Sequence, residues 1–238
     1  MRVMSYNVRV LRDDADAVVR VVRGARPDIL CVQEVPRFGW WRARRAGLAR
    51  RCGMRVAAGE RAGGLAIFVS ARVTVVHAEH HALSRVPALH RRALAVAVLD
   101  VAGAGRVIAA CVHLDLDAAA RQRHAAEIGA ILAGVHRRHP APVIVAGDIN
   151  EGPDGPAWRC LADGRADTHT AVAAAAGYTF PARDPRRRID AILVSPPLRP
   201  RPRTVPPVPE ADLVRASDHR PVIADLDYGP PSRPDRDA

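Results

Sequence analysis

Polar side chains that could do chemistry follow short apolar runs at several distant points of the chain. The segment Pro142–Asn150 reads PVIVAGDIN: an apolar run, a glycine, then Asp148 and Asn150 one residue apart. A carboxylate and a carboxamide at the end of a buried strand cost free energy unless they bind a partner. The same relation to an apolar run holds for Asn7, Glu34 and His113. The carboxyl ends of strands line one edge of an α/β sheet, so we expect these side chains to converge there.

This set of side chains supports metal-assisted hydrolysis. Glu34 offers a hard oxygen ligand, and Asn7 and Asp218 could join it. Ligands that are all oxygen, with water in the remaining positions, favour Mg²⁺ or Mn²⁺ over Zn²⁺. Two plainer readings stay open from the residues alone: Glu34 as a strand-end salt bridge, and Asp218 as part of an Asx turn.

Two histidines could act beside such an ion. Asp190 could hold His219, which would fix the tautomer of its ring and support the protonated form. His113 offers a second imidazole that could bind a phosphoryl oxygen or the leaving group. The alternative for His113 is a core histidine with satisfied hydrogen bonds.

Alternating strands and helices must position these groups. Strands are expected over Val3–Val8, Ile29–Val32, Val107–Leu114, Val143–Ala146 and Ile189–Val194. Asp13 and Asp14 open a helix that Gly24 closes, and Asp117 caps a longer one. Phe38–Arg51 predicts a helix whose aromatic residues pack in the core. The Pro-rich stretch 195–209 predicts a surface excursion or an edge strand, and the chain has no visible internal repeat.

Composition limits the class of protein. The 238 residues suit one domain, expected over 1–228, with a Pro-rich and charged tail at 229–238 expected to be disordered. The formal net charge of +11 fits an anionic partner. The chain has no lysine, and a bias in base composition explains the use of arginine in its place but not the excess of basic over acidic residues. The chain has no C-x-x-C pair, so we do not expect a structural zinc site. No signal peptide or membrane span is visible, so we expect a cytoplasmic protein.

The order of these motifs resembles the endonuclease/exonuclease/phosphatase superfamily, which has the deoxyribonuclease I-like fold. The resemblance covers nearly the whole chain and is carried by SYN at Ser5–Asn7, QE at Gln33–Glu34, VHLDL at Val112–Leu116, GDIN at Gly147–Asn150, RIDAIL at Arg188–Leu193 and SDHRPV at Ser217–Val222. It implies a four-layer α/β sandwich. In that fold two mixed, mostly antiparallel β-sheets pack face to face, with helices outside.

The resemblance also implies a role for each matching residue. The metal ligands would be Glu34, Asn7 and Asp218, holding Mg²⁺ or Mn²⁺. The catalytic residues would be His113, Asp148, Asn150, Asp190 and His219. Phosphate would be bound by Asn150, by His113 and by one of the adjacent arginines Arg91 and Arg92. Arg9 departs from the pattern, because some abasic-site endonucleases carry an acidic metal-site residue there.

The activity implied is divalent-metal-dependent hydrolysis of a phosphodiester, with nucleic acid as the favoured substrate because of the net charge. Two alternatives stay open. One is a phosphatase or phosphodiesterase acting on a phospholipid head group or a small phosphate ester. The other is a catalytically silent member that only binds phosphate groups. We expect no stable membrane insertion and, by default, a monomer.

Overall fold

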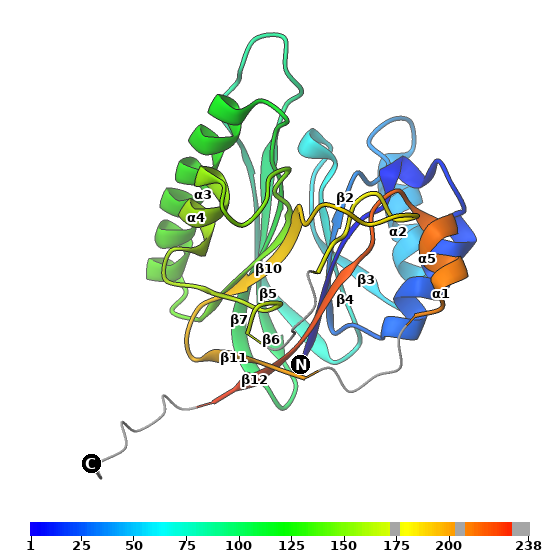
Figure 1. Cartoon of the computed structure of the whole chain (residues 1–238). Helices are drawn as coiled ribbons and strands as arrows, with labels where there is room; N and C mark the ends of the chain where they lie inside the picture. Colours follow the sequence, from blue (N-terminus) through cyan, green and yellow to red (C-terminus); the bar gives the residue numbers. More distant parts are fainter. Residues whose placement is uncertain (172–176, 203–207, 230–238) are drawn as a thin grey trace.

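Two six-stranded sheets packed face to face form the centre of the protein, as the computed structural model shows for residues 1–171, 177–202 and 208–229 (Figure 1). The strand order of sheet A is β11 (Leu198–Arg201), β12 (Val222–Tyr228), β1 (Arg2–Asn7), β2 (Ile29–Gln33), β4 (Ala66–Val69) and β3 (Arg55–Ala58). The order of sheet B is β5 (Val73–Ala82), β6 (Ala93–Val101), β7 (Gly105–His113), β8 (Val143–Asp148), β10 (Asp190–Val194) and β9 (Ala166–Asp167).

Helices cover the outer face of each sheet (Figure 1). Sheet A is covered by α1 (Ala15–Ala25), α2 (Trp41–Arg51) and α5 (Glu210–Ala216), and sheet B by α3 (Ala118–Arg138) and α4 (Pro156–Ala162). Two short 3-10 helices, η1 (Arg9–Leu11) and η2 (Ala62–Gly64), lie in loops. One apolar core fills the space between the sheets, and one lies under each helical layer. The expected four-layer α/β sandwich is confirmed.

The two sheets share one internal pattern. In each, the third and fourth strands run parallel, and every other neighbouring pair is antiparallel. The parallel pairs are β1 with β2 and β7 with β8, joined by crossovers that contain α1 and α3. The sequence shows no repeat, yet the fold places two βαβ units against each other.

The first two helices differ from their sequence expectations at their ends. The Asp14 carboxylate caps α1 as expected, but the helix continues through Gly24 to Ala25 and is capped by Arg26, which takes the left-handed φ of 50°. α2 begins only at Trp41, so Phe38 and Trp40 precede it and are 61% and 86% exposed. The expectation that these aromatic residues pack in the core was therefore wrong.

A buried arginine explains why this aromatic cluster stays outside. Arg45 is 1% exposed, stacks on Trp41, and donates hydrogen bonds to the carbonyl oxygens of Pro36 and Leu65. Its guanidinium supplies donors for loop carbonyls that would otherwise be buried without partners. The inner face of α2 is thus partly polar, and the turn before it faces solvent.

The C-terminal part agrees with expectation where it is described. β11 lies at the edge of sheet A, where the missing N–H group of its proline, Pro200, can face away from the sheet at no cost in ladder hydrogen bonds. Residues 203–207 of the Pro-rich stretch, and the predicted tail apart from Gly229, lie outside the described residues. Within the described ranges, no helix combines the length and apolarity needed to cross a bilayer.

Candidate active site

The polar strand ends meet at one edge of the sandwich. Asn7 ends β1 and pairs in register with Gln33, the last residue of β2, so Glu34 follows beside it. His113 ends β7 and pairs with Asp148 at the end of β8. β10 runs antiparallel to β8, and its first residue, Asp190, pairs with Asp148 as well. The two βαβ units therefore deliver their last residues to a common place.

The backbone turns sharply as it leaves two of these strands. Glu34 has a φ of 53° and Asn150 a φ of 59°, both in the left-handed region that non-glycine residues rarely adopt. Such strain concentrates at functional sites, where the surrounding structure holds it in place. Gly147 has a different role, because a Cβ there would lie 2.0 Å from the carbonyl oxygen of Val112. Only glycine permits this close approach of β7 and β8.

Asn7 links two carboxylates that come from opposite sheets. Its Nδ2 donates to Oε1 of Glu34 at 3.1 Å and to Oδ2 of Asp148 at 3.1 Å, while its Oδ1 accepts from the backbone N–H of Arg9. The second oxygen of Asp148 accepts from the backbone N–H of Asn150 at 2.9 Å. Two carboxylates thus lie within reach of one amide at the floor of the site.

His219 stands on the other side of Asp148. Its Nδ1 lies 2.9 Å from Oδ2 of Asp190, and the same oxygen accepts a 2.6 Å hydrogen bond from the hydroxyl of Thr179. The Nε2 of His219 lies 3.7 Å from Oδ2 of Asp148. The ring of Phe180 covers the imidazole at a centroid distance of 4.9 Å. Asp190 therefore fixes the ring and leaves Nε2 directed at Asp148.

Burial and neighbouring charges separate the proton affinities of these groups. Burial, together with the charge of Asp190, raises the pKa of Asp148 to about 7 in the absence of a metal ion. Burial alone would lower the pKa of His219, but the charge and hydrogen bond of Asp190 outweigh it and raise that pKa to about 9. His219 is thus cationic at neutral pH, next to a carboxylate that exchanges its proton there.

The pKa of the second histidine, His113, is shifted in the opposite direction. Nε2 of His113 lies 3.6 Å from Oδ2 of Asp148, and its side chain is buried. Burial lowers the pKa of His113 well below its ordinary value, and the charge of Arg92 lowers it further. His113 is therefore neutral when His219 is charged. The two imidazoles beside Asp148 thus differ in protonation state.

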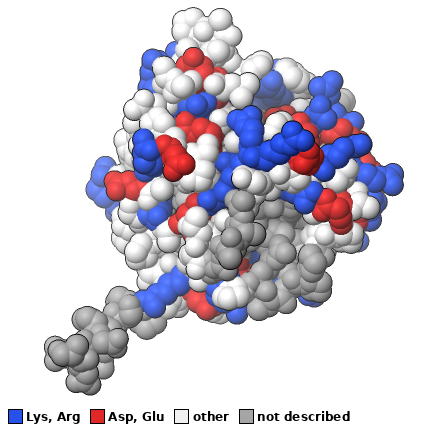
Figure 2. All heavy atoms as spheres, in the orientation of Figure 1, with Lys and Arg blue, Asp and Glu red and all other residues white. Residues whose placement is uncertain are grey.

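A cavity of about 360 Å³ opens above these groups. Glu34, Asp148 and Asn150 line it, and its basic wall consists of Arg37, His90, Arg91, Arg92, His113, Arg187 and His219. Of the two candidate arginines, Arg92 donates to Asp115 at 3.1 Å and is largely buried, whereas Arg91 is exposed. In Figure 2, basic side chains gather near the centre of the displayed face, with acidic ones scattered among them.

Comparison with known proteins decides the family. The family model described as Endonuclease/Exonuclease/phosphatase family matches residues 4–219, which include every site residue named above. The chain belongs to this family. Members of the family hydrolyse phosphate esters. The chain has no significant match among curated protein sequences.

Solved structures with the same fold include enzymes with different substrates. A mannosyl-6-phosphatase of Bacteroides thetaiotaomicron has 20% identity and a TM-score of 0.77, with 96% of this chain and 100% of that chain covered. The catalytic domain of human Nocturnin with bound sulfate has 19% identity and a TM-score of 0.75, covering 96% and 94%. ANGEL2, a 2′,3′-cyclic phosphatase in complex with adenosine-2′,3′-vanadate, has 16% identity and a TM-score of 0.71, covering 94% of both chains.

The side chains of this family member offer a place for a divalent cation. Oε2 of Glu34 has no hydrogen-bond partner among the described residues, and Glu34 and Asp148 both line the cavity. An ion held by one or two carboxylates and completed by substrate oxygens is the usual arrangement for Mg²⁺. Asp148, Asp190 and His219 could also surround an ion. The site thus offers two places for a divalent cation, one at the unpartnered oxygen of Glu34 and one at this cluster.

Asp218 lies apart from the other expected metal ligands. Its Oδ2 is 3.2 Å from Nε of Arg9, it is about one-third exposed, and it lines a separate shallow cavity. Arg9 departs from the pattern of the abasic-site branch, and its guanidinium meets Asp218 directly. The structure thus brings Asn7 and Glu34 together but places Asp218 in an ion pair beside them.

Several residues of the site gave no signal in the sequence. Thr179 and Phe180 come from a loop between β9 and β10, and Arg37 comes from the loop between β2 and α2 and lines the cavity. A Thr-aromatic pair shortly before the RID motif was the available hint for the first two. For Arg37 no hint existed, because arginine occurs throughout the chain.

Proposed function

We propose that the protein is a divalent-metal-dependent phosphoesterase that cleaves a phosphodiester. The observation that carries the proposal is the position of Asp148. Its Oδ2 is within 3.1 Å of Asn7, which also binds Glu34, and within 3.7 Å of His219, which Asp190 holds. A carboxylate between an oxygen-rich metal pocket and a fixed imidazolium has the partners that phosphoryl transfer requires.

Each side chain has a distinct task in this mechanism. A divalent cation at Glu34, with Asn7 and Asp218 nearby, would supply neutralisation of phosphate charge and stabilisation of the leaving oxygen. Asp148 orients the attacking water and accepts its proton, for which a pKa near 7 is well matched. His219 directs its Nε2 proton at the phosphoryl oxygens. Asn150 and the neutral His113 bind the non-bridging oxygens.

Nucleic acid is the first substrate class in this proposal. The formal charge of +11 favours polyanions, and the basic wall of the cavity contains Arg37, Arg91 and Arg187. Small phosphate esters are the second class, because a cavity of about 360 Å³ holds a ligand the size of a nucleotide or a sugar phosphate. A silent phosphate-binding protein is the third reading, and the intact Asp148, Asp190 and His219 cluster argues against it.

The test is a metal and substrate matrix. Purified protein would be assayed with Mg²⁺, with Mn²⁺ and with EDTA on single-stranded DNA, RNA, bis-p-nitrophenyl phosphate, p-nitrophenyl phosphate and a phosphoinositide. We expect turnover that EDTA abolishes and added metal restores. Faster cleavage of the nucleic acids than of the chromogenic esters supports the first substrate class, and the reverse supports the second.

Two variants connect this activity to the proposed residues. Asp148→Asn should lose activity, whereas the matched control Asp100→Asn, an exposed carboxylate on the β6–β7 hairpin, should keep it. Turnover that survives EDTA, or equal rates in the two variants, would overturn the mechanism. Binding of phosphate without turnover on any of these substrates would favour the silent reading.

A further inference from the structure

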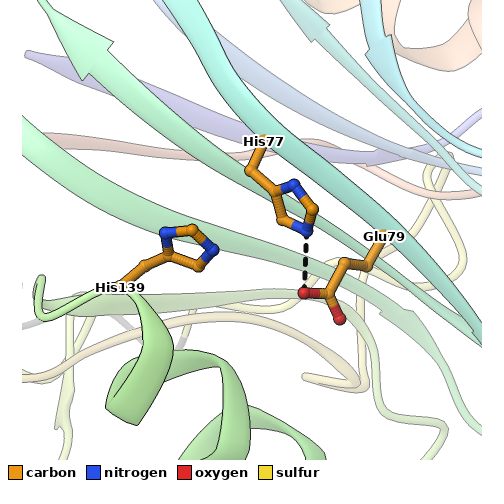
Figure 3. Close-up of side chains that lie close together, drawn as sticks. All are labelled: His77, Glu79 and His139. Atoms are coloured by element: carbon orange, nitrogen blue, oxygen red, sulfur yellow. Dashed lines mark hydrogen bonds and ion pairs between the residues drawn. The ribbon is translucent and has the colours of Figure 1, made fainter.

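A second histidine–carboxylate cluster lies on the outer side of sheet B, away from the active site. His77, Glu79 and His81 alternate along β5, the edge strand, so their side chains project to the same face. His139 follows the last turn of α3, which packs against that face. Figure 3 shows the imidazoles of His77 and His139 and the carboxylate of Glu79 directed toward one another.

The three side chains already form close contacts. Nε2 of His77 lies 2.9 Å from Oε1 of Glu79, and the rings of His77 and His139 stack with centroids 4.9 Å apart. One nitrogen or oxygen atom from each of the three residues lies within 4.8 Å of the others. None of the three lines the cavity of the active site, whose walls are formed by other described residues.

A zinc centre would need these ligand atoms closer together than they now lie. Zinc–nitrogen and zinc–oxygen bonds of about 2.0–2.2 Å in a tetrahedron place neighbouring ligand atoms about 3.3 Å apart. The side chain of His77 is 42% exposed, so its ring can move the remaining distance by rotation about its own side-chain bonds. Two imidazoles with one carboxylate suit Zn²⁺ and similar transition metals, while Mg²⁺ prefers oxygen ligands.

Groups around the carboxylate strengthen this reading. Nε2 of His81 lies 2.8 Å from Oε2 of Glu79, the oxygen that His77 does not contact. Partners of this kind orient a ligating carboxylate and raise metal affinity. Arg138 also donates to Oε1 of Glu79 at 2.5 Å, but its side chain is 54% exposed and can withdraw into solvent. Arg138 would therefore compete with a bound cation.

We propose that His77, Glu79 and His139 form a binding site for a divalent transition-metal ion, with Zn²⁺ as the best-matched ion, that joins the edge strand β5 to the end of α3. Water would complete the coordination. The site is independent of the phosphoesterase centre. Its effect would be to fix one edge of sheet B, because the ion would connect the edge strand to the end of the helix that packs on the same face.

The test is a Zn²⁺ titration of untagged protein by calorimetry, in excess Mg²⁺ so that the oxygen-lined active site is occupied. We expect one Zn²⁺ per chain at this site. The variants His77→Gln, Glu79→Gln and His139→Gln should each weaken that binding at least tenfold. The matched controls His136→Gln, whose ring binds the carbonyl of Ala141, and Glu127→Gln, whose carboxylate binds the N–H of Ser84, should bind as the wild type does.

Two further measurements separate metal binding from a structural role of these side chains. Arg138→Gln removes the competing cation and should tighten Zn²⁺ binding, a result that a simple surface salt bridge would not give. At about 100 times the wild-type dissociation constant, Zn²⁺ should raise the melting temperature of the wild type by about 5–10 °C, and that of Glu79→Gln by no more than about half as much. Equal Zn²⁺ affinity in the wild type and all three ligand variants would overturn the proposal.

Discussion

The two βαβ units of the protein have the same topology but deliver different chemistry. The unit β1–α1–β2 ends in Asn7 and Glu34, an amide and a carboxylate. The unit β7–α3–β8 ends in His113 and Asp148, an imidazole and a carboxylate. Each unit occupies the central parallel pair of its sheet, and the two pairs open at the same edge.

The same βαβ topology can thus present side chains suited to two different tasks, cation binding and proton transfer. The oxygen-rich end of the first unit suits a cation, while the end of the second, with His219 and Asp190 beside it, suits proton transfer. Asn7 joins them, because its amide donates to a carboxylate from each unit. We therefore expect variants of the second unit to affect the chemical step, and variants of the first to affect the response to metal concentration.

The largest expected effect belongs to the second unit. Asp148→Asn removes the group proposed to accept the proton of water, so kcat should fall by about 10²–10⁴. Steady-state kinetics at saturating Mg²⁺ would measure it. A loss of activity that excess Mg²⁺ repairs would show instead that Asp148 acts mainly on the metal, and the division between the two units would fail.

The matching change in the first unit is Glu34→Gln. It keeps the shape of the side chain but removes the charge that we propose binds the cation. We expect the Mg²⁺ concentration for half-maximal activity to rise by about tenfold or more, with part of the rate recovered at high Mg²⁺. Titrations of activity with Mg²⁺ in the wild type and variant would measure the shift. An unchanged midpoint would contradict the assignment.

Stability should depend on pH through the His219 and Asp190 pair. The pKa of His219 rises from an ordinary 6.5 to about 9 on folding, with Asp190 outweighing the opposing effect of burial. The stabilisation is therefore complete below about pH 6.5 and is lost as the pH rises through about 9, by on the order of 3 kcal/mol. Urea unfolding in EDTA between about pH 6 and pH 10 would measure it. His219→Gln should lack this decline, and an equal decline would contradict the prediction.

The smallest expected effects compare the two crossover helices. Asp14 caps α1 by accepting from the backbone N–H groups of Asp16 and Ala17, whereas Asp117 caps α3 by accepting from that of Ala120. Replacing either aspartate by alanine should cost about 0.5–2 kcal/mol in unfolding free energy, with Asp14→Ala the larger. Chemical denaturation would measure both. Neither change should alter kcat, since neither side chain reaches the cavity.

The sequence carried the fold and the strand-end residues of the site because both depend on local pattern. Apolar runs locate the strands, and the motif around Asp148 follows directly from one of them. The equivalence of the two sheets was invisible, because it lies in strand order and direction rather than in repeated residues. The exposure of Trp40 was also missed, since the burial of Arg45 depends on carbonyl groups supplied by distant loops.

Residues that contact the site from loops were also hard to identify from the sequence. Asp190 and His219 stand in recognisable motifs, whereas Thr179, which binds Asp190, lies in a loop with no pattern of its own. Asp218 was expected as a metal ligand with Glu34 because its motif matches that of the family, and in the structure its carboxylate forms an ion pair with Arg9. Residues placed by strand ends were thus accessible to sequence reasoning, and residues placed by loop conformation or ion pairing were not.

The left-handed backbone at Glu34 and Asn150 has an evolutionary consequence. Glycine adopts that conformation without strain, so a substitution at either position could increase stability while removing the metal ligand or phosphate contact that we propose there. Selection for turnover must therefore act continuously against a substitution that the fold itself favours. Relatives that had abandoned catalysis and kept only phosphate binding would be recognisable by glycine at these two strand exits.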